Sequence, residues 1–346
     1  MNPQRPPPVN PRCGEAGSIP SHSAPAAVLG TRVPATRPHR RRWGRLLGLA
    51  WSMAICLGLR LSAQAQPAAA APATAPHPAP SPGRFTASPA ERISDSLRQH
   101  TVQSEWQPGE VTVRVLLPDS LPADPLQAKH RLPVVYVLPV EAQAGDHYGD
   151  GLREVAKLDL ANRWQALFVV PTFAQLPWYA DHPTDPLVRQ ESHFVRGVVP
   201  WVERTYPARR TRSGRLLLGF SKSGWGAWSL LLRHPDLFER AVAWDAPLLL
   251  DRPGPYGSGD IFGSPDNFAQ YQLLPRLRNL RDKWTDSRRL ILPGHANFRR
   301  EHLELHRQLT DWQLPHDFVD TGPEKHDWHS GWVEPAVRQL LTDLPE

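Results

Sequence analysis

The sequence contains little cysteine, and what it has lies near the amino terminus. Of 346 residues only Cys13 and Cys56 are cysteines. Both precede the part of the chain that we expect to fold, so a disulfide framework is excluded there. A glycine-rich phosphate loop and a dinucleotide fingerprint are also missing from the sequence. We therefore expect no cofactor.

Acidic residues are almost missing from the first 65 positions, where Glu15 stands alone against nine arginines. The whole chain has 40 basic and 34 acidic residues and a formal net charge of +6. Without this leader, 31 basic and 33 acidic residues remain, a net charge of −2. The positive charge therefore belongs to the leader, and we expect no nucleic-acid partner for the rest of the chain.

A long hydrophobic run is missing as well. The apolar run from Leu46 to Leu59 is shorter than the ~20 residues that a membrane-spanning helix needs, and Arg60 ends it. A basic cluster precedes the run, and the sequence SAQA follows at 62–65. This order predicts a signal peptide cleaved after about Ala65 and export to the periplasm or the medium. A retained membrane anchor is the alternative; after processing we expect no stable membrane span.

The leader and the residues that follow it divide the chain into three predicted parts. Residues 1–65 form an N-terminal extension and the signal peptide. The 37 residues before the basic cluster are long for a signal peptide, so they are either an incorrectly assigned start or a disordered extension. Residues 66–105 are predicted to be an Ala/Pro-rich spacer and linker. Residues 106–346 are long enough for one α/β domain.

Strand and helix patterns alternate from about residue 106. Valines alternate with polar residues over 111–115, which predicts a half-exposed strand, and the apolar run 132–138 predicts a strand buried on both faces. Further strands are predicted at 166–170, 214–218, 240–244, 289–292 and 316–319. Helices are predicted around 151–163, 188–205, 224–233, 265–280, 298–313 and 331–343. Such repeated units predict a doubly wound, mostly parallel sheet with helices on both faces.

The strand at 214–218 runs into the sequence GFSKSGWGA at 219–227 and then into a helix. A strand-to-helix turn with Gly219 two residues before Ser221 is typical of a nucleophilic serine. The start of the helix directs free N–H groups at the site, which favours a developing oxyanion. Ser223 stands where the G-x-S-x-G motif has its last glycine. The alternative interpretation is an ordinary Gly/Ser turn that opens a helix.

These residues resemble the esterase D-like family of α/β-hydrolases, which includes feruloyl esterases, enterochelin esterases and mycolyltransferases. The resemblance covers about residues 106–343 and rests on the elbow, on PVVYVL at 133–138, on PWY at 177–179 and on VPWVE at 199–203. It implies the α/β-hydrolase fold and a Ser–His–acid site. In the family, His-Gly or a similar pair follows the strand at 133–138, whereas Pro139, Val140 and Glu141 follow here. The backbone N–H of Lys222, with that of Val140 or Glu141, would then form the oxyanion hole.

Two histidines compete for the role of general base. In this fold the histidine lies on a loop after the last strand, and His326 and His329 both follow the strand predicted at 316–319. His326 and Trp328 resemble the His-x-Trp loop of the family, so we predict that His326 is the base. His329 would then cap the final helix or support the site from behind.

The acid that orients this histidine has two candidate positions. Similar esterases read Gly-x-x-Asp after the strand at 289–292, but here Asn297 stands in that position. The preceding strand ends in Asp245, at the same edge of the sheet as the serine. We therefore predict Asp245 as the acid. The alternatives are that Asp245 only caps a turn and that Asn297 or Glu301 contacts the histidine.

Aromatic residues are frequent beside these loops, and 11 of the 13 tryptophans follow position 65. Trp178, Tyr179, Trp225 and Trp328 are predicted to line an aromatic cleft for an acyl or sugar group. His302 and His306 have the spacing of metal ligands on a helix, but no third ligand is evident, so we predict a solvated helix face and no metal site.

Together these features predict an exported serine hydrolase that cleaves a carboxylic ester through an acyl-enzyme on Ser221. The expected partner is a small-molecule or glycan-linked ester. Two alternatives remain open at this point. One is an acyltransferase of the same fold, in which an alcohol replaces water. The other is a non-catalytic, exported binding module with a degenerate hydrolase fold, consistent with the departures at Pro139, Ser223 and Asn297.

Overall fold

The computed structural model describes residues 85–345 apart from 123, 282, 285–287 and 322–324. All of them belong to one unit of the chain, Thr74–Glu346. The predicted extension, signal peptide and cleavage site lie outside the described residues, as does the spacer up to residue 84. Within the described part, no helix is both long and apolar enough to cross a membrane.

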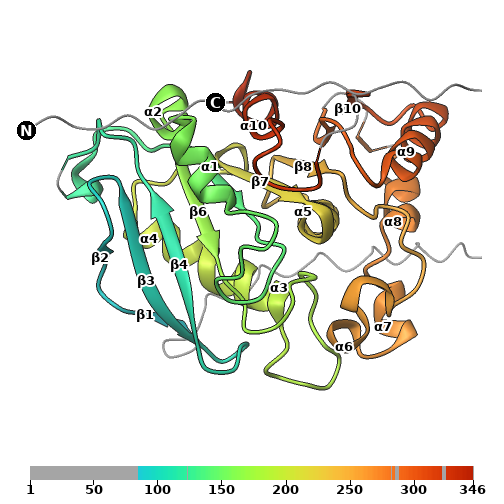
Figure 1. The fold of residues 1–346 in the computed structure, drawn as a ribbon, viewed down its shortest axis with the longest axis horizontal. Helices are drawn as coiled ribbons and strands as arrows, with labels where there is room; N and C mark the ends of the chain where they lie inside the picture. The colour runs from blue at the N-terminus through green and yellow to red at the C-terminus, as the bar shows by residue number, and fades with distance from the viewer. Residues whose placement is uncertain (1–84, 123, 282, 285–287, 322–324, 346) are drawn as a thin grey trace, which may run out of the picture. The chain divides into compact units, whose positions relative to one another are not determined.

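A ten-stranded mixed sheet forms the centre of the domain (Figure 1). Its strands are β1 (Phe85–Ala87), β2 (Glu91–Arg92), β3 (Leu97–Ser104), β4 (Glu110–Leu116), β5 (Val134–Val137), β6 (Leu167–Pro171), β7 (Arg215–Phe220), β8 (Arg240–Trp244), β9 (Leu290–Leu292) and β10 (His316–Phe318). The spatial order is β1-β3-β4-β6-β5-β7-β8-β9-β10, with β2 paired to β3. From β6 to β10 all pairs are parallel, whereas β1 to β4 and the β4–β6 pair are antiparallel. The sheet is therefore mostly parallel where the predicted site residues lie.

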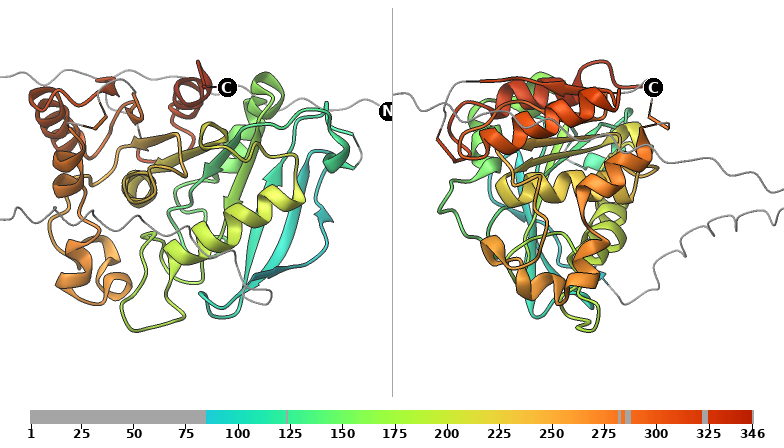
Figure 2. Two further views of the ribbon diagram at one scale, coloured as in Figure 1. Left: turned by 180° about the vertical axis from the view of Figure 1, so that it is seen from behind. Right: turned by 90° about the vertical axis from the view of Figure 1, so that its right-hand side faces the viewer.

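Helices cover both faces of the sheet, as the sequence predicts. They are α1 (Gly151–Lys157), α2 (Leu160–Trp164), α3 (Gln190–Ser192), α4 (Val199–Thr205), α5 (Ser221–Arg233), α6 (Gly259–Phe262), α7 (Pro265–Ala269), α8 (Leu273–Leu280), α9 (Arg299–Asp311) and α10 (Val333–Leu341). The edge strands β1, β3 and β4 lie at one end of the domain, and α8 and α9 lie at the other (Figure 1, Figure 2).

Side chains of the central strands point alternately into two hydrophobic clusters, one on each face of the sheet. On β5, Val135 and Val137 pack with α1, α2 and α10 on one face, while Val134 and Tyr136 pack with α4, α5, α8 and α9 on the other. This alternation follows from the pleat of the strand. Because such a strand is covered on both faces, its sequence is apolar throughout. That is why the run at 132–138 predicts its strand so clearly.

The start of the folded part differs from the sequence prediction. Residues 85–105 were expected to belong to the linker, yet β1, β2 and β3 lie there and pair within the sheet. The side chain of His100 on β3 is buried and its Nε2 lies 2.6 Å from the Tyr206 hydroxyl. The predicted boundary at residue 106 is therefore wrong. The strands carry many polar residues on a partly exposed edge, so their hydrophobic pattern is weak.

The helix predicted over 188–205 is also more complex than expected. It consists of α3, a π-helical segment at His193–Val198 and α4. Pro200 lies just after the π-helical segment within a continuous helical run, and its missing N–H removes one helix hydrogen bond at this junction.

Candidate active site

Ser221 occupies the sharp turn between β7 and α5. Its φ of 52° lies in the left-handed region, which a non-glycine residue adopts only when the surroundings hold it there. Gly219 makes the turn sterically accessible, because a Cβ at this position would lie 2.2 Å from the carbonyl oxygen of Ser223. The serine is therefore presented at the carboxyl end of β7 and at the start of α5.

Ser223, the departure from the G-x-S-x-G pattern, has a structural role in the same turn. Its buried hydroxyl accepts a hydrogen bond from the backbone N–H of Phe220 at 3.0 Å and donates one to the Phe220 carbonyl at 2.9 Å. The side chain thus satisfies two backbone groups of the elbow. A serine at this position closes the turn and does not disrupt it.

His326 links Ser221 to Asp245. Its Nε2 lies 3.1 Å from Ser221 Oγ, and its Nδ1 lies 2.5 Å from Asp245 Oδ2. Because a carboxylate only accepts, Nδ1 carries the proton and Nε2 presents a lone pair to the serine hydroxyl. The competing His329 is elsewhere: its Nδ1 lies 2.8 Å from Glu154 Oε2. Of the two histidines, the structure brings His326 to the serine.

Asp245 lies at the end of β8 and is completely buried, with a φ of 41°. Its Oδ1 accepts a hydrogen bond from the N–H of Phe298 at 2.7 Å, and its Oδ2 accepts one from the N–H of Asn297 at 2.9 Å. Burial alone would raise the pKa of Asp245. The hydrogen bonds from His326 and from these backbone groups outweigh burial, so this pKa lies below its ordinary value and the carboxylate is ionised.

The loop after β9 therefore supports the acid through its backbone. The side chain of Asn297, which stands in the acid's usual position, belongs to an exposed residue, and the N–H of the same residue binds Asp245. Glu301, the other alternative, accepts a hydrogen bond from the N–H of Leu249 at 2.9 Å. Burial raises the pKa of Glu301. Neither alternative replaces Asp245 at the histidine.

Four aromatic side chains surround the ring of His326. The rings of Phe220, Tyr148, Phe298 and Trp244 have centroids 4.6, 5.6, 5.9 and 6.5 Å from it. Tyr148 and Phe298 were not singled out from the sequence. The sequence did hold a signal for Phe298. This residue directly follows Asn297, and a residue next to the expected position of the acid should lie near the histidine. Tyr148 lies on a loop without a motif, and nothing in the sequence distinguishes it.

The predicted oxyanion residues lie on the two segments that flank Ser221. Lys222 is the second residue of α5, and Val140 and Glu141 follow β5 at the same edge of the sheet. The Tyr179 hydroxyl donates a hydrogen bond to the carbonyl of Pro139 at 2.7 Å, which fixes the start of this loop. Burial lowers the pKa of the Lys222 ammonium, and the nearby carboxylate of Glu141 opposes the shift.

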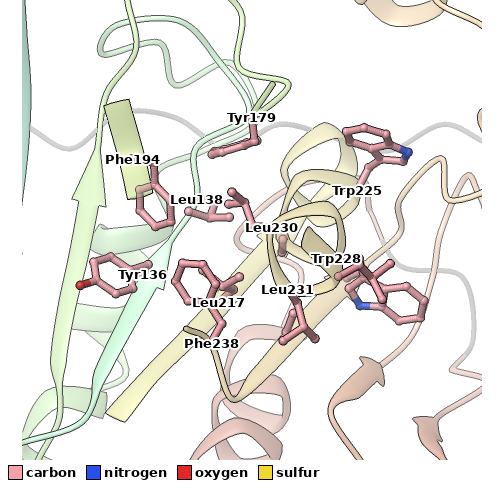
Figure 3. Packing of buried hydrophobic residues seen from close by; sticks show 14 of the residues in the cluster. Tyr136, Leu138, Tyr179, Phe194, Leu217, Trp225, Trp228, Leu230, Leu231 and Phe238 are labelled. Carbon is pink, nitrogen blue, oxygen red and sulfur yellow. The ribbon is translucent and has the colours of Figure 1, made fainter. Parts of the chain in front are cut away.

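The predicted aromatic cleft is absent. Trp178, Tyr179 and Trp225 have no exposed surface and Trp328 is 2 % exposed, so they have almost no surface to offer a ligand. Figure 3 shows Tyr179 and Trp225 among the buried side chains of the larger hydrophobic cluster. Trp328 packs against Phe220 with ring centroids 5.5 Å apart. The assignment of these four residues to substrate binding is corrected: they build the core beneath the site.

A surface cavity of about 540 Å³ lies between the loop after β8 and α9, and its lining includes none of Ser221, His326 and Asp245. Tyr256, one of its walls, packs edge-on against Phe298, whose ring in turn lies beside His326. The lining mixes apolar and charged side chains and consists of Leu249, Leu250, Asp251, Arg252, Pro255, Tyr256, Arg300, Glu301 and Glu304.

The solvated helix face predicted for His302 and His306 is wrong at His302, which is completely buried. His302 Nε2 accepts a hydrogen bond from the N–H of Ala246, and His306 Nδ1 lies 2.8 Å from His316 Nε2. Among the residues that the structure describes, no group of His, Cys, Asp and Glu is arranged to hold a metal ion.

Comparisons with known proteins agree with this geometry. A family model described as "Putative esterase" matches residues 104–303, more than half of the chain. The sequence itself matches none of the curated proteins with which it was compared.

Solved structures share the fold at low sequence identity. An S-formylglutathione hydrolase from Agrobacterium tumefaciens has a TM-score of 0.58 at 14 % identity, with 75 % of this chain and 99 % of that chain covered. A substrate-bound, fluorophosphonate-binding serine hydrolase from Staphylococcus aureus has a TM-score of 0.57 at 17 % identity, with 75 % and 100 % covered. A ferulic acid esterase has a TM-score of 0.56 at 18 % identity, with 71 % and 96 % covered.

Proposed function

Because this chain belongs to the "Putative esterase" family of α/β-hydrolases, we propose that it cleaves a carboxylic ester through an acyl-enzyme on Ser221. The single observation that carries the proposal is the hydrogen-bonded row from Ser221 through His326 to Asp245. The row runs from residues with some solvent access, 9 % for Ser221 and 16 % for the side chain of His326, to a fully buried carboxylate. A substrate can approach one end while water is excluded from the other.

The catalytic triad works by moving one proton. His326 Nε2 takes the proton of the Ser221 hydroxyl as its oxygen attacks the ester carbonyl, and the buried Asp245 stabilises the resulting imidazolium. The N–H of Lys222, with that of Val140 or Glu141, holds the oxyanion. His326 then gives the proton to the leaving alcohol. Water, deprotonated by the same nitrogen, hydrolyses the acyl-enzyme.

Two observations favour catalysis over a degenerate binding module. The serine in place of the last glycine completes the elbow through two hydrogen bonds, and the asparagine in the acid's usual position donates its N–H to the actual acid. Two of the three departures from the family pattern, at Ser223 and Asn297, therefore have a compensating contact. Acyl transfer to an alcohol uses the same residues and remains the second candidate function.

We propose a small-molecule or glycan-linked ester as the substrate. The cavity beside Phe298 is within the size range of small-ligand sites, and its walls combine an aromatic ring with charged groups that can hydrogen-bond to a polar substituent. Structures that share the fold act on ferulic acid esters and on S-formylglutathione by their descriptions. We also propose export after cleavage near Ala65, on the basis of the basic, apolar and small-residue order of the leader.

Covalent labelling tests the proposal. A fluorophosphonate probe should label the protein, and Ser221→Ala should abolish both labelling and turnover of a p-nitrophenyl ester, a fall of several orders of magnitude. Ser223→Ala is the matched control, because it removes a neighbouring buried hydroxyl without touching His326. It should keep labelling and lower the Tm, since two backbone groups of Phe220 lose their partner. Labelling that persists in Ser221→Ala and disappears in Ser223→Ala would move the nucleophile.

A further inference from the structure

The loop after β8, residues 245–249, and the first turn of α9 hold each other through four hydrogen bonds. Two run from the backbone N–H groups of Asn297 and Phe298 to the carboxylate of Asp245. The other two run in the opposite direction, from backbone N–H groups of the loop to side chains of the helix. Ala246 donates to His302 Nε2 at 2.9 Å, and Leu249 donates to Glu301 Oε2 at 2.9 Å.

His302 is suited to accept this hydrogen bond permanently. It is completely buried on α9, and burial lowers the pKa of His302 from 6.5 to about 4, although the nearby Asp245 opposes the shift. The side chain is therefore neutral near pH 7. Because its Nε2 accepts from Ala246, the ring proton must be on Nδ1. The imidazole acts as a fixed acceptor for a single backbone group.

The backbone at this point needs such support. Asp245 has a φ of 41°, a left-handed conformation that costs free energy in a non-glycine residue. The N–H that directly follows it belongs to Ala246, which is completely buried. Without an acceptor this donor would be unsatisfied, and the turn would gain from relaxing toward an ordinary conformation. A relaxed turn would move the carboxylate of Asp245, whose contact with His326 spans only 2.5 Å.

We propose that His302 is a positioning residue that fixes the turn after β8 and thereby holds Asp245 against His326. The proposal rests on the proposed function, because it assigns His302 a task in the same reaction. His302 is not a member of the hydrogen-bonded row; it acts through the backbone between Asp245 and Ala246. A side chain with an acceptor at the position of Nε2 should replace it.

Three variants separate positioning from general support of the fold. His302→Leu removes the acceptor, His302→Gln offers an amide oxygen at similar reach, and His306→Leu changes the same residue type one turn later on the same helix, where it contacts His316. For each variant, kcat and KM are measured on a p-nitrophenyl ester. The concentration of active enzyme is taken from the amount of fluorophosphonate bound when labelling is complete. The Tm is measured in parallel.

We expect His302→Leu to lower kcat about tenfold to a hundredfold, the usual range for loss of a group that orients a site residue. Its KM should stay within twofold, and His302→Gln should recover most of kcat. His306→Leu should leave kcat unchanged. If His302→Leu does not fold, His302→Asn takes its place, because the shorter amide does not reach the N–H of Ala246.

The opposite results are equally distinct. A His302→Leu protein with a lowered Tm and an unchanged kcat would show a structural role only and reject the proposal. Equal loss of kcat in the Gln and Leu variants would reject the acceptor role. If instead the wild-type protein has no turnover that depends on Ser221, the proposed function fails and His302 loses its task with it.

Discussion

At the residue scale, the acid at position 245 is the least expected part of the site. Its carboxylate accepts from His326, Asn297 and Phe298, and each of its oxygens binds at least one donor. An acid in the loop after β8 thus receives from the loop after β9 the amide donors that keep it ionised. The carboxylate that stabilises the imidazolium thus follows β8, whereas the backbone groups that position this carboxylate follow β9.

Asp245→Asn should keep the shape of the side chain and remove its charge. The amide would also favour the wrong tautomer of His326, so we expect turnover to fall by up to ~10⁴-fold, measured as kcat on a p-nitrophenyl ester. Asn297→Asp is the comparison, since only the N–H of residue 297 contacts the site and its side chain is exposed. Turnover that survives in Asp245→Asn and rises in Asn297→Asp would transfer the role of the acid to the loop after β9.

The sequence revealed a site residue where the local backbone or the order of strands determines its position. Ser221 is marked by the backbone demands of its turn, and His326 by its place after the last strand, so both were predicted. Trp178 and Trp225 were assigned to a substrate cleft because their sequence positions adjoin the site. Sequence position does not determine the direction of a side chain, and both rings point into the core.

At the scale of the elements, the elbow between β7 and α5 depends on one close backbone approach. A Cβ at Gly219 would meet backbone atoms of Ser223 and Gly224, and backbone atoms cannot rotate away as a side chain does. The helix cannot retreat either, because α5 packs on both β7 and β8 and is buried along most of its length.

Gly219→Ala should therefore displace Ser221 or prevent folding. We expect fluorophosphonate labelling to fall at least tenfold, since a strained turn of this kind costs of order 1–3 kcal/mol to rearrange. Gly259→Ala is the control, because its nearest neighbour lies at 3.6 Å, an ordinary van der Waals distance for the added methyl. Full labelling of Gly219→Ala at an unchanged Tm would contradict the steric argument.

The central strands were predictable and the strands β1 to β3 at one edge were not, for one physical reason. Strands such as β5, buried on both faces, must be apolar throughout, which the sequence displays openly. By contrast most residues of β3 are only half-buried, so polar residues alternate with His100 and Val102 and the apolar pattern is weak. Its pairing partner β4 was recognised because valines mark its buried face.

At the scale of the whole molecule, the antiparallel end belongs to the fold. Strand β3 pairs with β4 over seven residues, and His100 reaches Tyr206 behind α4. A chain that starts at Gln66 should give a cooperative thermal transition and active enzyme. A chain that starts at Trp106 lacks β1 to β3 and should be insoluble or lose that transition, as judged by circular dichroism and solubility. A stable, active protein starting at Trp106 would restore the original boundary.

Acid should weaken the fold through buried neutral histidines. Burial lowers the pKa of His193 from 6.5 to about 3 and that of His302 from 6.5 to about 4. Below pH 6.5 these histidines become protonated in the unfolded chain but stay neutral in the folded protein. The stability present above pH 6.5 is therefore lost progressively toward pH 3. Each histidine adds a slope of up to ~1.4 kcal/mol per pH unit.

His193→Leu isolates one of these contributions. Both ring nitrogens of His193 are buried without a partner among the described residues, so an apolar side chain is tolerated there. Urea unfolding at pH 7, 6, 5 and 4.5 should give a shallower decline for the variant than for the wild type. Parallel declines would show that His193 is not a buried neutral group.

The exposed side chain of Asn297 has a consequence for the evolution of the site. Since this position serves the site only through its main chain, it tolerates an amide and a carboxylate alike. A chain with acids at both strand ends could therefore lose the one at position 297 by a single substitution, because Asp245 alone holds His326.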